Sequence, residues 1–151
     1  MNAKALVALV LLTLIGCSET REESFASMSA PEAQDLMSRG WMPAVLPTTA
    51  TEVRVRTNPD TNTVRGRARI PAADLDQLRA VLRPLGDDVA APFGVDSDVT
   101  PDWWPAELRP PDRSSELKRR GWEVYSVPDR AVAYMALHAS DGWVYFWYES
   151  S

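Results

Sequence analysis

The sequence predicts an α+β domain with a mainly antiparallel sheet of about five strands and one or two helices packed on one face. Three observations predict this fold class. Residues 52–70 alternate between apolar and charged side chains around a turn, residues 71–82 carry apolar side chains at helical spacing, and residues 122–149 hold three strand-forming segments. Strands that follow one another through short turns favour antiparallel pairing.

The first seventeen residues have the three zones of an export signal. Lys4 supplies a positive charge, residues 5–15 form an uncharged apolar run, and Leu14-Ile15-Gly16-Cys17 follows. A helix of that length is about 16 Å long, roughly half the hydrocarbon thickness of a bilayer, so the run suits a signal peptide and not a membrane span. An ordinary secretory signal, cleaved after a small residue, is the alternative.

The segment Leu14-Ile15-Gly16-Cys17 resembles the lipobox of bacterial lipoproteins. The resemblance implies cleavage before Cys17 and attachment of diacylglycerol to its thiol. Cys17 is the only cysteine in the chain, and lipidation accounts for a thiol that cannot form an internal disulfide. In lipoproteins of enteric-type bacteria, a serine such as Ser18 in place of aspartate implies sorting to the outer membrane, where the domain would face the periplasm.

Three regions follow from this interpretation. We expect a signal peptide over residues 1–16, a lipidated Cys17 with a flexible tether over residues 17–30, and a single globular domain over residues 31–151. The tether is expected because residues 18–30 are polar and acidic, with only two large apolar side chains.

The first element expected in the domain is a short helix from Pro31 to about Gly40. Proline is favoured in the first turn of a helix, Glu32 lies near the positive end of the helix dipole, and a glycine suits the position just past the helix. Pro43 and Pro47 then predict an extended connection.

A β-hairpin is expected next, because residues 52–56 and 64–70 alternate strictly on either side of turn-forming residues 57–62. Five apolar side chains share one face of this hairpin: Val53, Val55, Val64, Ala68 and Ile70. Five arginines share the other: Arg54, Arg56, Arg65, Arg67 and Arg69.

A helix over about residues 71–82 follows, with Leu75, Leu78, Val81 and Leu82 on one apolar stripe. Residues 84–113 contain six prolines and are expected to be irregular. Strands are then expected over residues 122–127, 130–139 and 143–149, the last two joined by the turn Ser140-Asp141-Gly142.

Several short motifs along residues 41–151 are similar to those of short uncharacterised exported proteins of proteobacteria. These motifs are Trp41-Met42-Pro43, Leu46-Pro47, Asp60-Thr61-Asn62, Trp103-Trp104-Pro105 and residues 145–150. That group has no assigned activity, so the resemblance implies no function.

Composition argues against several classes of function. A net charge of −5 is unlike the basic surface that nucleic acid requires. A Ser-His-Asp triad would have to use the only histidine, His138, for which a structural place in a strand is the alternative. One cysteine and one histidine cannot form a typical zinc site. We therefore expect a non-enzymatic binding or accessory module without a cofactor or metal.

Other classes of function stay open. A small hydrolase acting on peptidoglycan or glycans through two carboxylates is one alternative, and an inhibitor of such an enzyme is another. A purely structural lipoprotein is the third.

Two surfaces are candidates for binding. The five hairpin arginines suit an anionic envelope ligand or an envelope protein, because guanidinium binds phosphate and carboxylate in bidentate fashion. Their alternative role is a solvated face paired with the protein's own acids. Trp103 and Trp104 could line a sugar or peptide groove, or could belong to the core. The bilayer itself, through acylated Cys17, is the remaining expected partner.

Overall fold

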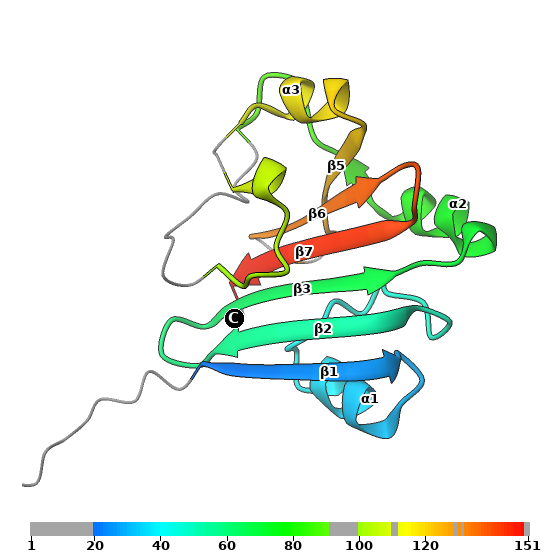
Figure 1. Cartoon of the computed structure of the whole chain (residues 1–151), viewed down its shortest axis with the longest axis vertical. Coiled ribbons are helices and arrows are strands. Elements are labelled where there is room, and N and C mark those ends of the chain that lie inside the picture. Colours follow the sequence, from blue (N-terminus) through cyan, green and yellow to red (C-terminus); the bar gives the residue numbers. More distant parts are fainter. Residues whose placement is uncertain (1–19, 91–99, 110–111, 129, 131, 150–151) are drawn as a thin grey trace, which may run out of the picture.

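The computed structural model describes residues 20–90, 100–109, 112–128, 130 and 132–149. Within these ranges the chain forms one seven-stranded antiparallel sheet with the order β1-β2-β3-β7-β6-β5-β4 (Figure 1). The strands are β1 (Arg21–Ser27), β2 (Thr51–Asn58), β3 (Thr63–Arg69), β4 (Arg83–Pro84), β5 (Trp122–Ser126), β6 (Ala133–His138) and β7 (Trp143–Glu149). The helices are short: α1 (Pro31–Ser38), α2 (Ala72–Val81), the single 3₁₀ turn η1 (Ala106–Leu108) and α3 (Ser114–Arg119).

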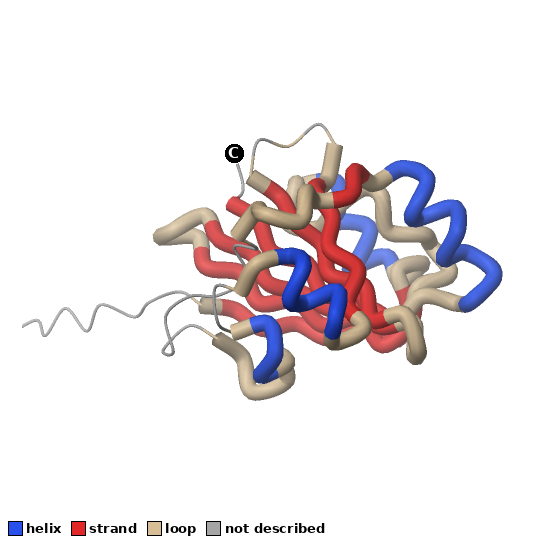
Figure 2. Tube along the Cα trace, turned by 90° about the horizontal axis from the view of Figure 1, so that it is seen from above, coloured by secondary structure: helices blue, strands red, loops and turns tan. Residues whose placement is uncertain are grey.

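This architecture shows that the predicted fold class, a sheet of about five strands with helices packed on one face, was wrong. The described sheet has seven strands, because β1 and the two-residue β4 extend its two edges. The helices are short and lie on both sides of the sheet (Figure 2).

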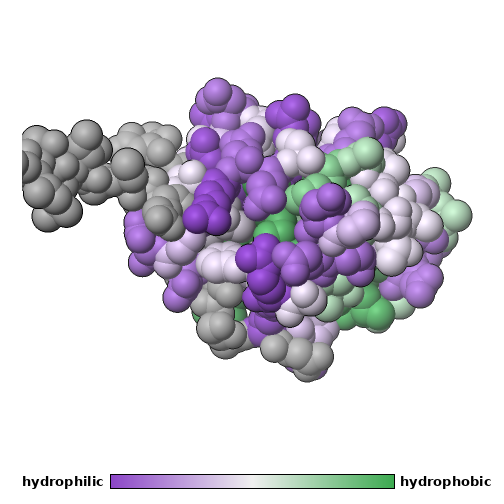
Figure 3. All heavy atoms as spheres, turned by 90° about the horizontal axis from the view of Figure 1, so that it is seen from below, coloured by the Kyte–Doolittle hydropathy of each residue, from purple (hydrophilic) through white to green (hydrophobic). Residues whose placement is uncertain are grey.

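Strand β1 lies in a segment that composition alone predicted to be a flexible tether. Its backbone pairs with β2 from Arg21 opposite Thr57 to Ser27 opposite Thr51. An edge strand needs only one partner, and charged side chains along it discourage pairing with other chains. The molecule seen from below, the β1 side, is accordingly mostly hydrophilic (Figure 3). The tether prediction is therefore wrong for residues 21–27, and the sheet begins before residue 31.

Strands β6 and β7 are apolar on both faces, which explains why helices cover both. Along β7, Val144, Phe146 and Tyr148 belong to one buried cluster, whereas Tyr145 and Trp147 belong to the other. The first cluster is covered by α1 and α2, through buried side chains such as Leu36 and Leu78. The second is covered by η1 and α3, through Leu108 and Leu117. Because neighbouring side chains of a strand point to opposite faces, a two-sided apolar strand requires two covering layers.

Most individual elements are confirmed. The predicted hairpin corresponds to β2 and β3, with its five apolar side chains buried. The two predicted helices correspond to α1 and α2, and Gly40 has φ +82°, as a residue just past a helix requires. Val81 departs from the predicted stripe because its side chain is 46% exposed. The three expected C-terminal strands are β5, β6 and β7.

Candidate functional site

The five predicted arginines lie on one face of β2 and β3. Arg54 is opposite Arg67 and Arg56 is opposite Arg65, and residues directly opposed in antiparallel strands share a face. Arg69 follows Arg67 by two positions, so it points the same way. We refer to Arg54, Arg56, Arg65, Arg67 and Arg69 as the arginine face.

Strand β7 continues this face with aromatic side chains. Each arginine of β3 is opposite an aromatic residue: Arg65 is opposite Trp147, Arg67 opposite Tyr145, and Arg69 opposite Trp143. A row of cations therefore borders a row of aromatic rings across one pair of strands.

The arginine face is only partly exposed. Arg54 and Arg69 are exposed, and Arg56 and Arg67 have intermediate exposure. Arg65 is 5% exposed and counts as a buried residue. The surface available to a ligand is therefore smaller than five alternating arginines predict.

Two carboxylates of the neighbouring strands pair with the arginine face. The Nε of Arg56 lies 3.3 Å from an oxygen of Glu22, and Nη1 of Arg69 lies 3.2 Å from an oxygen of Glu52. Glu22 also accepts a hydrogen bond of 2.8 Å from the indole N–H of Trp103. The sequence did not predict a role for Glu22, because that residue was placed in the tether.

Arg67 lies between two indole rings. Its guanidinium carbon is 4.7 Å from the ring centroid of Trp143 and 5.6 Å from that of Trp103. Cation–π contacts of this kind contribute about 0.5–2 kcal/mol each. The rings therefore fix the position of this guanidinium in the middle of the face.

The predicted aromatic surface of Trp103 and Trp104 is divided by the structure. Trp104 is 2% exposed and packs edge-on against Tyr145 with a centroid distance of 5.6 Å. It is a core residue, so the alternative stated for it from the sequence is the correct one. Trp103 is only partly buried and belongs to the arginine face through its contacts with Arg67 and Glu22.

A shallow pocket of about 210 Å³ lies beside Trp143. Its lining combines aromatic rings with two carboxylates: Pro105, Glu107, Trp122, His138, Asp141, Trp143 and Tyr145. Burial raises the pKa of the Tyr145 phenol, Arg67 opposes the rise, and the carboxylates of Asp141 and Glu107 add to it. The sequence missed this pocket because its members come from three separate segments.

His138 does not form a catalytic triad in this pocket. Its Nδ1 lies 3.0 Å from the hydroxyl of Ser140 and 3.2 Å from a carboxylate oxygen of Asp141. A triad needs the nucleophile and the acid on opposite ring nitrogens. Both partners here belong to the β6–β7 turn, so the contacts are those of a turn.

A larger groove of about 510 Å³ lies where β2 and β3 meet the β6–β7 turn. Polar members of its lining include Thr51, Glu52, Arg69, Ser140 and Asp141. Glu52 has φ +50°, in the left-handed region that non-glycine residues rarely adopt, where the β2–β3 register shifts. This conformation accompanies the ion pair between Glu52 and Arg69.

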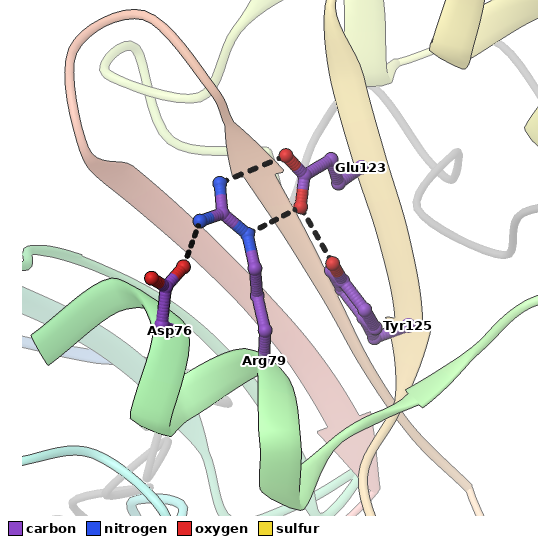
Figure 4. A network of polar contacts seen from close by, with 4 residues as sticks. All are labelled: Asp76, Arg79, Glu123 and Tyr125. Atoms are coloured by element: carbon purple, nitrogen blue, oxygen red, sulfur yellow. Dashed lines mark hydrogen bonds and ion pairs between the residues drawn. The ribbon is translucent and has the colours of Figure 1, made fainter.

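A polar network away from the arginine face ties α2 to β5 (Figure 4). Arg79 donates hydrogen bonds of 2.8 and 2.9 Å to the two oxygens of Glu123 and one of 2.9 Å to Asp76. The hydrogen bonds from Arg79 lower the pKa of Glu123. Tyr125 donates to Glu123 at 2.5 Å, and its own burial, followed by this contact, raises its pKa to about 12. All four members of this network are paired, which indicates that the network has a structural role.

The remaining predictions concern the anchor and metals. Cys17 and the signal peptide lie outside the described residues. No helix in the described part of the chain has the length and hydrophobicity needed to cross a bilayer. The same residues contain no group of three or more His, Cys, Asp or Glu side chains placed to hold a metal ion.

Comparison with models of known protein families matches part of the chain. Residues 19–68 match the model of the YbbD head domain. No curated protein and no solved structure matches the chain. The matched segment begins just before β1 and ends within β3, so it contains four members of the arginine face together with Glu22 and Glu52. Over this third of its length, the chain is similar to the YbbD head domain.

Proposed function

We propose that the protein is an envelope lipoprotein, held to the outer membrane by acyl chains on Cys17, whose exposed arginines bind an anionic ligand. One observation carries the binding proposal: two pairs of arginines are directly opposed across β2 and β3. Like charges so placed destabilise a sheet by up to about 1 kcal/mol per pair. Two arginines of this face, Arg56 and Arg69, form ion pairs with Glu22 and Glu52. A cluster of guanidinium groups attracts anions.

The proposed contact surface is the exposed part of the face. Arg54 and Arg69 present exposed guanidinium groups, and Arg67 is held between them by Trp103 and Trp143. Guanidinium forms bidentate hydrogen bonds with carboxylate and phosphate oxygens. In the envelope, these chemistries belong to peptidoglycan, lipid headgroups and acidic proteins.

Co-sedimentation across a salt series tests this proposal. A soluble chain beginning at Ser18, which retains β1, is mixed with purified sacculi or with vesicles containing phosphatidylglycerol. We expect binding that weakens as salt rises. Changing Arg54 and Arg69 together to Gln is expected to weaken it at least about tenfold, because hydrogen bonds to charged groups contribute about 1.5–3 kcal/mol each.

The matched control changes Arg39 and Arg119 to Gln. Both are exposed, and each pairs with an acid close to it in the sequence, Asp35 and Glu116 respectively. Equal losses in the two double variants, or no binding to either probe, would contradict the anion-binding surface.

The anchor is tested separately in cells. Cys17→Ser removes the thiol that the lipobox resemblance assigns to diacylglycerol, so acyl labelling should be lost and the signal peptide should stay attached. Acyl labelling that survives this substitution would contradict the anchor without affecting the binding proposal.

A second candidate function is a hydrolase acting on glycans. The observation that favours it is the pocket of about 210 Å³, in which Glu107 and Asp141 accompany tryptophan rings. Such enzymes use two carboxylates on either side of the glycosidic bond. Release of reducing ends from sacculi, abolished by both Glu107→Gln and Asp141→Asn, would support it.

A further inference from the structure

We propose that the end of the sheet formed by the start of β1 and the β2–β3 turn rests against lipid headgroups. The opposite end, with the groove at Glu52 and Arg69, then points away from the bilayer. This inference rests on the anchoring part of the proposed function, and its test does not require that the anionic ligand be known.

The first argument is the short distance along the chain between the anchor and the sheet. Strand β1 begins at Arg21, four residues after Cys17. Four residues span at most about 14 Å even when fully extended. A flexible segment continuing to residue 30 would have allowed roughly 45 Å by the same measure. The pairing of β1 with β2 therefore removes most of the predicted freedom.

The match to the YbbD head domain also places the start of the domain close to Cys17. Residues 19–68 match the YbbD head domain, so the similarity begins two residues after Cys17. The match and the strand pairing are separate observations, and both place the beginning of the domain next to the anchor.

The strand register decides which end of the sheet lies near the bilayer. Arg21 is opposite Thr57, close to the end of β2, and Thr63 at the start of β3 is opposite Glu149 of β7. The start of β1, the β2–β3 turn and the end of β7 are therefore neighbours at one end of the sheet (Figure 1).

The chemistry of this end is compatible with a headgroup surface. The turn presents Asp60, Thr61 and Asn62, which are all exposed, and Arg21 at the start of β1 is exposed as well. Asp60 and Arg21 carry opposite charges, so their interactions with a charged headgroup surface partly cancel. The length of the tether therefore sets the orientation.

The groove lies at the far end of the same strands. Strand β3 has seven residues, so its two ends are about 20 Å apart at 3.3 Å per residue. One Debye length is about 8 Å at physiological ionic strength, so this separation exceeds two Debye lengths. Glu52, Arg69 and Asp141 would therefore face the aqueous compartment and meet partners that are not part of the anchoring bilayer.

Lipid quenching of a fluorophore tests this orientation. The acylated protein is reconstituted in phosphatidylethanolamine–phosphatidylglycerol vesicles that contain lipids with a quencher on the headgroup. Cysteine is introduced at one of two exposed positions, Thr61 in the β2–β3 turn or Ala72 just beyond β3, and is labelled. We expect the label at position 61 to be quenched at least about threefold more than the label at position 72.

A variant with a longer tether tests whether the short tether causes the orientation. Twenty Gly and Ser residues inserted between Ser18 and Glu19 would have a root-mean-square length of about 25 Å, and the difference between the two labels should then disappear. Equal quenching without the insertion would overturn the orientation, and a difference that survives the insertion would overturn the short tether as its cause. Protein that does not remain with the vesicles would instead overturn the anchor, which is the part shared with the proposed function.

Discussion

Arg79 shows how one side chain joins two elements of the fold. It lies on α2 and binds both oxygens of Glu123 on β5, while Tyr125 donates to the same carboxylate. The arginine and the glutamate are each about one-third exposed, so solvent screens the ion pair and its contribution to stability is modest. The network nevertheless makes stability depend on pH.

Acid should weaken the fold through Glu123. Its pKa is lowered below 4.5 by the hydrogen bonds from Arg79. A group with a lowered pKa stabilises the fold above its unfolded pKa, and that contribution is lost as pH falls through the folded pKa. We expect the free energy of unfolding to decrease below about pH 4.5, and Glu123→Gln should make this decrease smaller by up to about 1 kcal/mol. Urea unfolding at pH 3, 4 and 6 measures this effect.

Alkaline pH should act through Tyr125. Its pKa is raised from 10.0 to about 12, mainly by burial. The neutral phenol is therefore favoured in the folded state, and its stabilising effect is lost as pH rises from about 10 to about 12. Tyr125→Phe should reduce the loss of stability at alkaline pH. It should also reduce the loss in acid slightly, because the hydrogen bond from Tyr125 helps to lower the pKa of Glu123. If Tyr125→Phe changed the free energy of unfolding only at acid pH, this assignment would be contradicted.

Among the elements, β3 depends on one glycine for its contact with β7. Gly66 is opposite Phe146, and a Cβ at residue 66 would lie 2.0 Å from Cζ of that ring. The ring therefore occupies the space where any other residue would place its side chain. Residue 66 must be glycine because β3 and β7 approach closely at this point. Its backbone angles are those of an ordinary strand and do not themselves require glycine.

Gly66→Ala should therefore destabilise the protein strongly. The buried Phe146 ring would have to move within a packed core, and overpacking typically costs about 1–3 kcal/mol. Because the overlap is severe, we expect about 3 kcal/mol in urea unfolding. Gly86→Ala is the control, since its Cβ would meet only Val89 at an ordinary 3.5 Å. Similar effects at the two glycines would argue against the close approach.

Strand β1 shows why an element can escape prediction. Among its seven residues, only Phe25 is a large apolar side chain, so composition resembles that of a tether. Its stability comes from backbone hydrogen bonds to β2 and from Phe25 against the first core cluster. Backbone pairing depends on a partner distant in the sequence, and it leaves no signature in composition.

On the scale of the whole molecule, one sheet separates two buried clusters. The first contains Leu36 and Leu78 from the helices, and the second contains Trp104, Trp122 and Trp147. Strands β6 and β7 contribute side chains to both clusters, so loosening one side removes support from the other. This arrangement predicts a single cooperative transition for the whole domain.

Leu36→Ala tests that cooperativity. Leu36 is 4% exposed in the first cluster, and removing such a side chain costs about 2–5 kcal/mol. Tryptophan fluorescence, which reports mainly on the second cluster, should shift by the same amount as far-UV circular dichroism. Val81→Ala, at an exposed position of α2, should change stability by less than about 0.5 kcal/mol. Separate transitions for the two probes would mean that the clusters unfold independently.

The sequence by itself determined the local pattern of this protein. Alternation in residues 52–70 located β2 and β3 and assigned their five arginines to one face, and helical spacing located α2. These features follow from the periods of the strand and the helix, which depend only on neighbouring residues. The lipobox resemblance at Cys17 is likewise local, and it stays a prediction.

Only the tertiary structure decided what surrounds each side chain. A period of two tells which face an arginine occupies, but the strand register decides that Arg67 meets Trp143 and that Arg56 meets Glu22. The tertiary structure also placed Trp104 in the core and Trp103 over Arg67. Contacts between distant segments depend on the free energy of the whole fold, and a local sequence pattern does not contain that information.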